Sequence, residues 1–241
     1  MRILKNVLTI IINILFGVFA GTALLCIALS LPNGNVDKHV GMSAETIMHE
    51  GTYPDISRRF SSTLDNFNDS MMLIEAADNS DNSLLQRSMA IYRGNIDGCF
   101  NPAESLVYHY IDDTPYDRTY TYPRYWHGYL VFLKPLLEIV TYDTLRIING
   151  IIQFGFFLLT AYFLVKRKKE LYVIPWMLGY LMLMPIVQAK SLQYSSCYYI
   201  FMLGVATLLL LSEEQVRKYE PFVFLNIGIL LAYFDLSILS Y

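Results

Sequence analysis

Two carboxylates in the first half of the chain have a spacing that suits chemistry. Asp65 and Asp69 are four residues apart in the segment 64–70, so both lie on one face if this segment is helical. Such a pair can share a divalent metal ion or divide into an acid and a base. The simpler interpretation is that both are solvated residues near a helix N-terminus, where the macrodipole favours negative charge.

A second group of candidate residues lies in the segment 122–129, which contains Arg124, Trp126 and His127. Tyrosine and tryptophan are common at the membrane–water interface, which accounts for the aromatic residues of this segment. A guanidinium binds phosphate through two parallel hydrogen bonds, and an imidazole donates another or transfers a proton. The segment therefore predicts either a phosphate-binding part of a substrate site or an anchor to lipid headgroups.

Lys190 is a third candidate, because it lies between two apolar runs in a turn that we expect on the outer face. Cations are scarce in the short loops on that face of membrane proteins. Lys190 is therefore a candidate for binding a phosphate or diphosphate, and the alternative is an ordinary exposed lysine. The sequence contains no GxSxG, HExxH, Walker or GxGxxG motif, so it lacks the catalytic motifs that are usual in soluble enzymes.

Long apolar runs indicate that these residues lie beside a membrane. The chain has 241 residues, of which 54% are apolar and 16% charged, whereas soluble domains carry about 25% charged residues. A run of about 20 apolar residues is typical of a membrane-spanning helix. The fold class is therefore all-α and integral to the membrane, and the first run is interpreted as a retained signal anchor. Five spans are predicted, at 7–31, 144–165, 171–187, 196–212 and 221–241.

The charges of the connecting segments predict the orientation. Basic residues precede the first span and follow the second and the fourth, so alternating spans place all three basic groups on one side. The positive-inside rule makes that side cytoplasmic, and the chain is then a multi-pass cell-membrane protein with its N-terminus inside. Residues 32–127 lie outside, with 14 Asp and Glu against 7 Lys and Arg. The net charge of the whole chain, −3, gives no reason to expect a nucleic-acid partner.

The outer segment is expected to fold, because it is far longer than a simple connection and contains many apolar and aromatic residues. Residues 62–77 have the pattern of an amphipathic helix that lies against the membrane or the spans, and 83–92 has a second helical pattern. An interfacial or re-entrant helix is expected at 128–140, since this stretch is too short to cross the bilayer. Three parts result: a first span at 1–31, an acidic outer domain at 32–127, and the interfacial helix with four spans at 128–241.

The order of these features resembles bacterial membrane proteins of the GT-C glycosyltransferase type. The likeness rests on a long outer segment after the first span, on its acidic stretch at 65–69, and on the motif at 124–130; the sequence Tyr-Phe-Asp-Leu at 233–236 also resembles a segment of those proteins. The resemblance implies transfer of a sugar from a polyprenyl-phosphate carrier to a cell-envelope acceptor. It implies a catalytic carboxylate in the first outer loop, for which Asp65 is the best match and Asp69 the second.

In the same resemblance, Arg124, Trp126, His127 and Lys190 are expected to bind the substrate, and the basic groups would offset charge on the departing phosphate. A divalent metal is left open. GT-C enzymes usually have about eight or more spans, whereas five are predicted here. The resemblance therefore implies a shortened or split version of the family. The rival interpretation is a noncatalytic membrane subunit or scaffold whose outer domain binds a partner, and a membrane-protein partner would complete the bundle.

Overall fold

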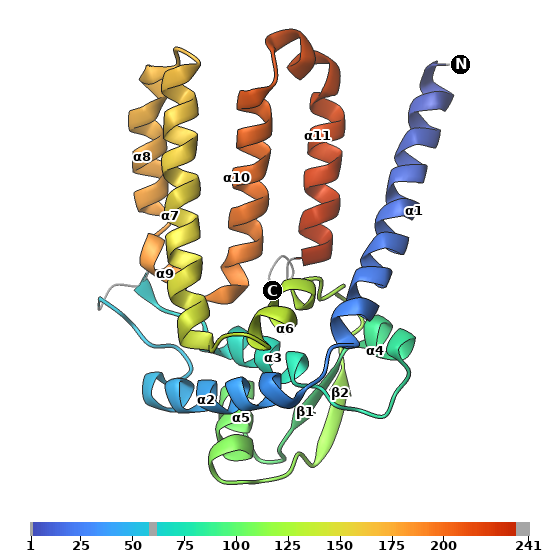
Figure 1. Cartoon of the computed structure of the whole chain (residues 1–241), viewed down its shortest axis with the longest axis vertical. Coiled ribbons are helices and arrows are strands. Elements are labelled where there is room, and N and C mark those ends of the chain that lie inside the picture. The colour runs from blue at the N-terminus through green and yellow to red at the C-terminus, as the bar shows by residue number, and fades with distance from the viewer. Residues whose placement is uncertain (1, 58–61, 235–241) are drawn as a thin grey trace.

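In the computed structural model, which describes residues 2–57 and 62–234, long helices stand side by side on a compact domain (Figure 1). This domain lies between the first and second predicted spans and is named the outer domain after the side on which it is expected. The helices are α1 (Arg2–Leu29), α2 (Gly34–Glu50), α3 (Asn66–Ala76), α4 (Leu84–Ala90), α5 (Pro102–Ile111), α6 (Leu130–Leu137), α7 (Tyr142–Lys166), α8 (Val173–Met182), α9 (Pro185–Lys190), α10 (Ser195–Leu210) and α11 (Glu213–Phe234). Two short 3-10 helices, η2 (Glu170–Tyr172) and η3 (Leu192–Tyr194), precede α8 and α10.

Three helical segments are long and apolar enough to cross a membrane: Asn6–Leu29, Tyr142–Lys166 and Leu192–Leu210. They correspond to the first, second and fourth predicted spans. The third predicted span is broken, because the backbone of Met184 is left-handed (φ 51°) and Pro185 begins a separate helix, α9. The ten residues of α8 extend about 15 Å, half of a bilayer core. The fifth predicted span extends into 235–241, which lie outside the described residues, as does Asp235.

The basic turns lie at one end of the long helices, as predicted. Figure 1 shows the start of α1, the α7–α8 turn and the α10–α11 turn at the end opposite the outer domain. Lys166, Arg167 and Lys169 belong to the first of these turns, and Arg217 and Lys218 follow the second. One end of the bundle therefore carries the basic turns, and the other end is covered by the outer domain.

The outer domain is mainly helical, but the prediction of an all-α chain misses a two-stranded antiparallel sheet. Strand β1 (Tyr92–Asn95) pairs with β2 (Arg118–Thr121), with Tyr92 opposite Thr121. The buried core lies in this domain and at its junction with the spans, where Val40 of α2, Leu73 of α3 and Leu106 of α5 are buried together. This domain is thus a packed unit on which the long helices stand.

Three helices of the outer domain, α3, α4 and α5, begin where side chains cap them. The helix predicted at 62–77 begins only at Asn66, because the Asp65 carboxylate accepts a hydrogen bond from the Asn68 N–H and caps it. Ser83 caps α4 in a capping box with Gln86. Of the two positions expected for this helix, against the membrane or against the spans, the contacts of α3 fit the second, since it contacts η3 and α6 as well as α2, α5 and β1 and is buried on almost all sides.

Close helix contacts depend on glycine at α1. A methyl group on Gly21 would lie 2.5 Å from the Tyr233 ring of α11, and the Tyr233 hydroxyl donates a hydrogen bond of 2.7 Å to the Gly21 carbonyl. At the same place the Gly128 N–H donates to the Tyr233 carbonyl at 2.9 Å. Small residues permit such close approach between membrane helices. The interfacial helix predicted at 128–140 is α6, which packs against α1.

Candidate functional site

A cavity of about 610 Å³ lies where the outer domain meets α7, α8 and α9. Its polar end is formed by Glu50 of α2, Asp143 and Arg146 of α7, and Lys190 at the end of α9. Its apolar walls come from successive turns of α7 and from α8 and α9, including Ile147, Ile151, Phe154, Tyr180 and Ile186. The cavity therefore combines a charged end with an apolar end, as a site for an amphipathic molecule requires.

Arg146 organises the polar end from a buried position, with 5% of its surface exposed. Its Nη1 donates to both carboxylate oxygens of Glu50 at 2.9 Å, and its Nη2 donates to Asn66 Oδ1 at 2.8 Å. Its Nε donates to the Lys190 carbonyl at 2.7 Å. A buried charge is stable only when it is paired and hydrogen-bonded. Arg146 thus ties α2, α3 and α9 to α7 and fixes the backbone of Lys190.

Asp69 is fully buried and holds η3, the short helix that leads into α10. It accepts hydrogen bonds from the Tyr142 hydroxyl at 2.6 Å, from the Leu192 N–H at 2.9 Å and from the Gln193 N–H at 3.1 Å. Burial raises the pKa of Asp69 to about 6, against the lowering effect of the Tyr142 hydrogen bond and of the two N–H groups. Its acceptor positions are occupied by the protein, so the geometry gives Asp69 a positioning role.

Asp65 is half-buried and reaches the same segment of the chain. Its carboxylate accepts from the Asn68 N–H at 3.1 Å, from the Asn68 side chain at 2.9 Å and from the Gln193 side chain. Its own N–H donates to Ser191 Oγ at 3.2 Å. Both aspartates therefore contact residues 191–193, Asp69 from within α3 and Asp65 from the cap position before it.

Lys190 and Asp143 are the exposed charges of the cavity. The Lys190 side chain is exposed, and within residues 2–57 and 62–234 no carboxylate forms an ion pair with its ammonium. The Asp143 carboxylate accepts a hydrogen bond of 2.7 Å from the Thr46 hydroxyl. Among the sequence-predicted residues, Lys190 alone lines this cavity.

His127 belongs to a separate buried cluster, with 1% of its surface exposed. Its Nδ1 lies 3.1 Å from Glu75 Oε2, and its Nε2 lies 3.0 Å from the Tyr122 carbonyl oxygen. The Tyr129 hydroxyl donates to the same Glu75 oxygen. Burial lowers the pKa of His127, but the Glu75 carboxylate and the Tyr122 carbonyl outweigh it, so the pKa lies above its usual value. The cluster fixes the segment by which the outer domain returns to the bundle.

Arg124 and Trp126 lie apart from both aspartates. The Arg124 guanidinium is exposed and lies 5.9 Å from the centre of the Tyr125 ring, and Trp126 packs against Tyr233 with ring centres 6.1 Å apart. In the described part of the chain, no hydrogen bond or ion pair joins Arg124 or His127 to Asp65. The residues predicted from the sequence to form one site thus lie in three places in the structure. Lys190 lines the cavity, the two aspartates contact residues 191–193, and Arg124, Trp126 and His127 belong to the segment that returns to the bundle.

Sequence reasoning missed Glu50, Asp143 and the role of Arg146. Arg146 carried a readable signal, because it is the one charge in an otherwise apolar run, and ionisable residues in spanning helices are usually functional or paired. Glu50 had no such signal, since its partner is 96 residues away. Over the described ranges, no three His, Cys, Asp or Glu side chains form a group that can hold a metal ion.

Comparisons of the chain with protein-family models, with curated proteins and with solved structures gave no match.

Proposed function

We propose that this protein is a membrane glycosyltransferase of the GT-C type, which moves a sugar from a polyprenyl-phosphate carrier to a cell-envelope acceptor on the outer face. The observation that carries the proposal is the cavity at the outer end of α7, with Lys190 and Asp143 exposed at its polar end and isoleucines along its apolar end. A polyprenyl-phosphate sugar has the same division into an anionic head and an apolar chain.

The orientation is part of the proposal, with the N-terminus inside and residues 32–127 outside. It is supported by the basic turns at one end of the helices. On a background without Cys26, Cys99 and Cys197, single cysteines at Ser80 and at Lys168 should react oppositely with an impermeant thiol reagent added outside. Labelling of the Lys168 position and protection of the Ser80 position would reverse the orientation.

The residues of the cavity divide the chemistry between them. The Lys190 ammonium offsets negative charge on the carrier phosphate as the bond between the anomeric carbon and the phosphate oxygen breaks. The acceptor hydroxyl forms the new bond to the anomeric carbon, and its proton passes to a carboxylate. Asp143 is the carboxylate that the geometry favours, because it is exposed in the cavity and Asp69 is occupied by backbone N–H groups. Asp65, at the edge of this region, is the second choice.

Binding of the carrier tests the proposal without knowledge of the sugar. Polyprenyl phosphate and the uncharged polyprenol of equal length are titrated against the full chain in neutral vesicles. Because a hydrogen bond to a charged group contributes about 1.5–3 kcal/mol, Lys190→Gln should weaken phosphate binding by roughly 10- to 100-fold and leave polyprenol binding unchanged. Lys38→Gln, at an exposed position of α2, is the matched control. Equal binding of both lipids to the unmodified protein would contradict the proposal.

A transfer or complementation assay then separates the carboxylates. Asp143→Asn should lower sugar transfer by about 10²- to 10⁴-fold, the range for loss of a general base. Full transfer in Asp143→Asn with loss in Asp65→Asn would move the role to Asp65.

A noncatalytic membrane subunit or scaffold is the second candidate, and two observations favour it. Asp65, Asp69 and His127 each have protein hydrogen-bond partners, as structural residues do. The apolar window of α1 is only 11% buried, so much of this helix is open to lipid or to another membrane protein. Unchanged complementation by the double variant Asp65→Asn/Asp143→Asn, with normal amounts of protein in the membrane, would favour this second candidate, because neither carboxylate would then be needed for chemistry.

A further inference from the structure

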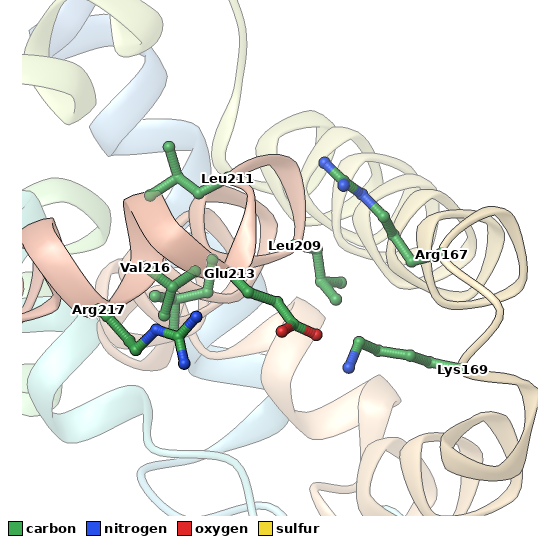
Figure 2. Close-up of a pocket in the computed structure, with 8 residues that line it drawn as sticks. Arg167, Lys169, Leu209, Leu211, Glu213, Val216 and Arg217 are labelled. Carbon is green, nitrogen blue, oxygen red and sulfur yellow. The ribbon is translucent and has the colours of Figure 1, made fainter.

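A second cavity, of about 470 Å³, lies at the opposite end of the bundle, between the α7–α8 turn and the start of α11. Three cations line it: Arg167 and Lys169 from the first turn and Arg217 from α11. Figure 2 shows the side chains of Arg167 and Lys169 extending toward α11, with the Glu213 carboxylate between Lys169 and Arg217. The cations thus come from segments about 50 residues apart in the sequence and surround one space.

The floor of this cavity is apolar. Leu208, Leu209 and Leu211 lie at the end of α10, and Val216 lies on the first turns of α11. The turn between these helices is held by Ser212 and Gln215, since the Ser212 N–H donates to the Gln215 side chain at 2.9 Å. The cations therefore lie beside a leucine-rich surface where α7 and α10 end, and both of these helices are long and apolar enough to cross a membrane.

The three cations are not neutralised by the protein. Arg167 donates from Nη2 to the Leu210 carbonyl. Across the described ranges, none of the three forms an ion pair with a carboxylate, Glu213 included. Three cations and one carboxylate leave the cavity with an excess of two positive charges. Such an excess favours an anionic ligand, and a guanidinium pair suits a phosphate.

We propose that this cavity binds the phosphate headgroup of an anionic phospholipid, with the lipid chains along the leucines of α10. Basic pockets between helices at a membrane surface are suited to such headgroups. The general preference for basic residues on one side requires only that the charges lie there. It does not require that three of them converge over an apolar floor, and Lys166 and Lys218 of the same turns instead lie near the rings of Tyr162 and Tyr219.

The test uses two triple variants with equal loss of charge. The site variant is Arg167→Gln/Lys169→Gln/Arg217→Gln. The matched control is Lys166→Gln/Lys168→Gln/Lys218→Gln, which removes three cations from the same turns outside the cavity lining. The full chain is reconstituted with phosphatidylglycerol or phosphatidylcholine, and the retained lipid is counted by native mass spectrometry.

The unmodified protein should retain phosphatidylglycerol in preference to phosphatidylcholine. Each cation near an anionic lipid contributes roughly a fivefold factor, so the site variant should lose about 100-fold in affinity for phosphatidylglycerol. The control variant should lose less than about fivefold, less than one such factor. Equal loss in both variants would show unspecific attraction and overturn the proposal. Binding of soluble glycerol phosphate as tight as that of the lipid would also overturn it, because the leucine floor would then contribute nothing.

A variant that is expected to bind more lipid separates the proposal from folding defects, because a misfolded protein would not gain binding. Glu213→Gln removes the carboxylate from among the cations and should raise retention of phosphatidylglycerol about fivefold. Glu214→Gln, one residue further along and outside the cavity lining, is the matched control and should leave retention unchanged. Equal retention in the two single variants would contradict the proposal even if the site variant does not fold.

Discussion

The two ends of the long helices carry charge in opposite ways. At the outer end Arg146, Asp69 and Glu75 are buried, and each has hydrogen-bond partners within the protein. At the other end Arg167, Lys169 and Arg217 are exposed, and none forms an ion pair among the described residues. The comparison teaches that buried charges must form ion pairs or hydrogen bonds within the protein, whereas exposed charges can remain without an ion pair and can bind a ligand.

The largest effect is expected from breaking the buried pair at the outer end. Arg146→Met leaves Glu50 without its cation, and loss of one partner of a buried pair costs about 3–5 kcal/mol in the free energy of unfolding. The free energy is measured by reversible unfolding in mixed detergent micelles. Arg118→Gln is the control, because Arg118 and Asp97 also pair at 2.8 Å but their side chains are 62% and 47% exposed. That variant should leave the free energy of unfolding nearly unchanged, because solvent screens an exposed pair. If both variants lowered the free energy of unfolding equally, burial would not be what makes the Arg146 contacts important.

An intermediate effect is expected from the pH dependence of Asp69. Because its pKa is about 6 in the folded protein and 3.8 in the unfolded chain, the folded state binds the proton more tightly. The resulting stabilisation is complete below pH 3.8 and is lost as the pH rises through 6. The stability of the unmodified protein relative to Asp69→Asn should therefore fall by up to about 3 kcal/mol between pH 4 and pH 7. A relative stability that rises with pH would show that hydrogen bonding, and not burial, governs this carboxylate.

The smallest effect is expected at the far end. Arg217 is exposed and has no ion-pair partner in the part of the chain that the structure describes. Arg217→Gln should change the free energy of unfolding by less than about 0.5 kcal/mol in uncharged detergent. The same micelle experiment measures this change. A cost of more than about 1 kcal/mol would mean that this cation contributes to the fold as Arg146 does.

Local patterns predicted the parts of this protein that depend on neighbours in the sequence. The apolar runs at 7–31, 144–165 and 196–212 became helices able to cross a membrane, because length and hydropathy decide this property. The break of the third span was also readable, since the residue before Pro185 is disfavoured in a helix. The sequence did show that the outer segment would fold, although it did not show the β1–β2 pair.

The candidate site was less predictable, because its contacts join distant parts of the chain. Asp69 contacts Leu192 and Gln193, which are 123 and 124 residues further along. No local pattern indicates such a partner. Helical spacing assumed that Asp65 and Asp69 lie in one helix, and it could not show that Asp65 caps that helix and that Asp69 holds a backbone turn.

The contact between α1 and α11 has a consequence for the synthesis of the protein. The Tyr233 hydroxyl and the Gly21 carbonyl meet across 212 positions of the sequence. At 5–20 residues per second, roughly 10–40 s pass between the translation of these two residues. In the proposed membrane orientation, the first helix resides in the bilayer during that time, with lipid where α11 will later pack. Its long uncharged surface suits this interval, since a helix that is apolar on all sides is stable in lipid before its neighbour arrives.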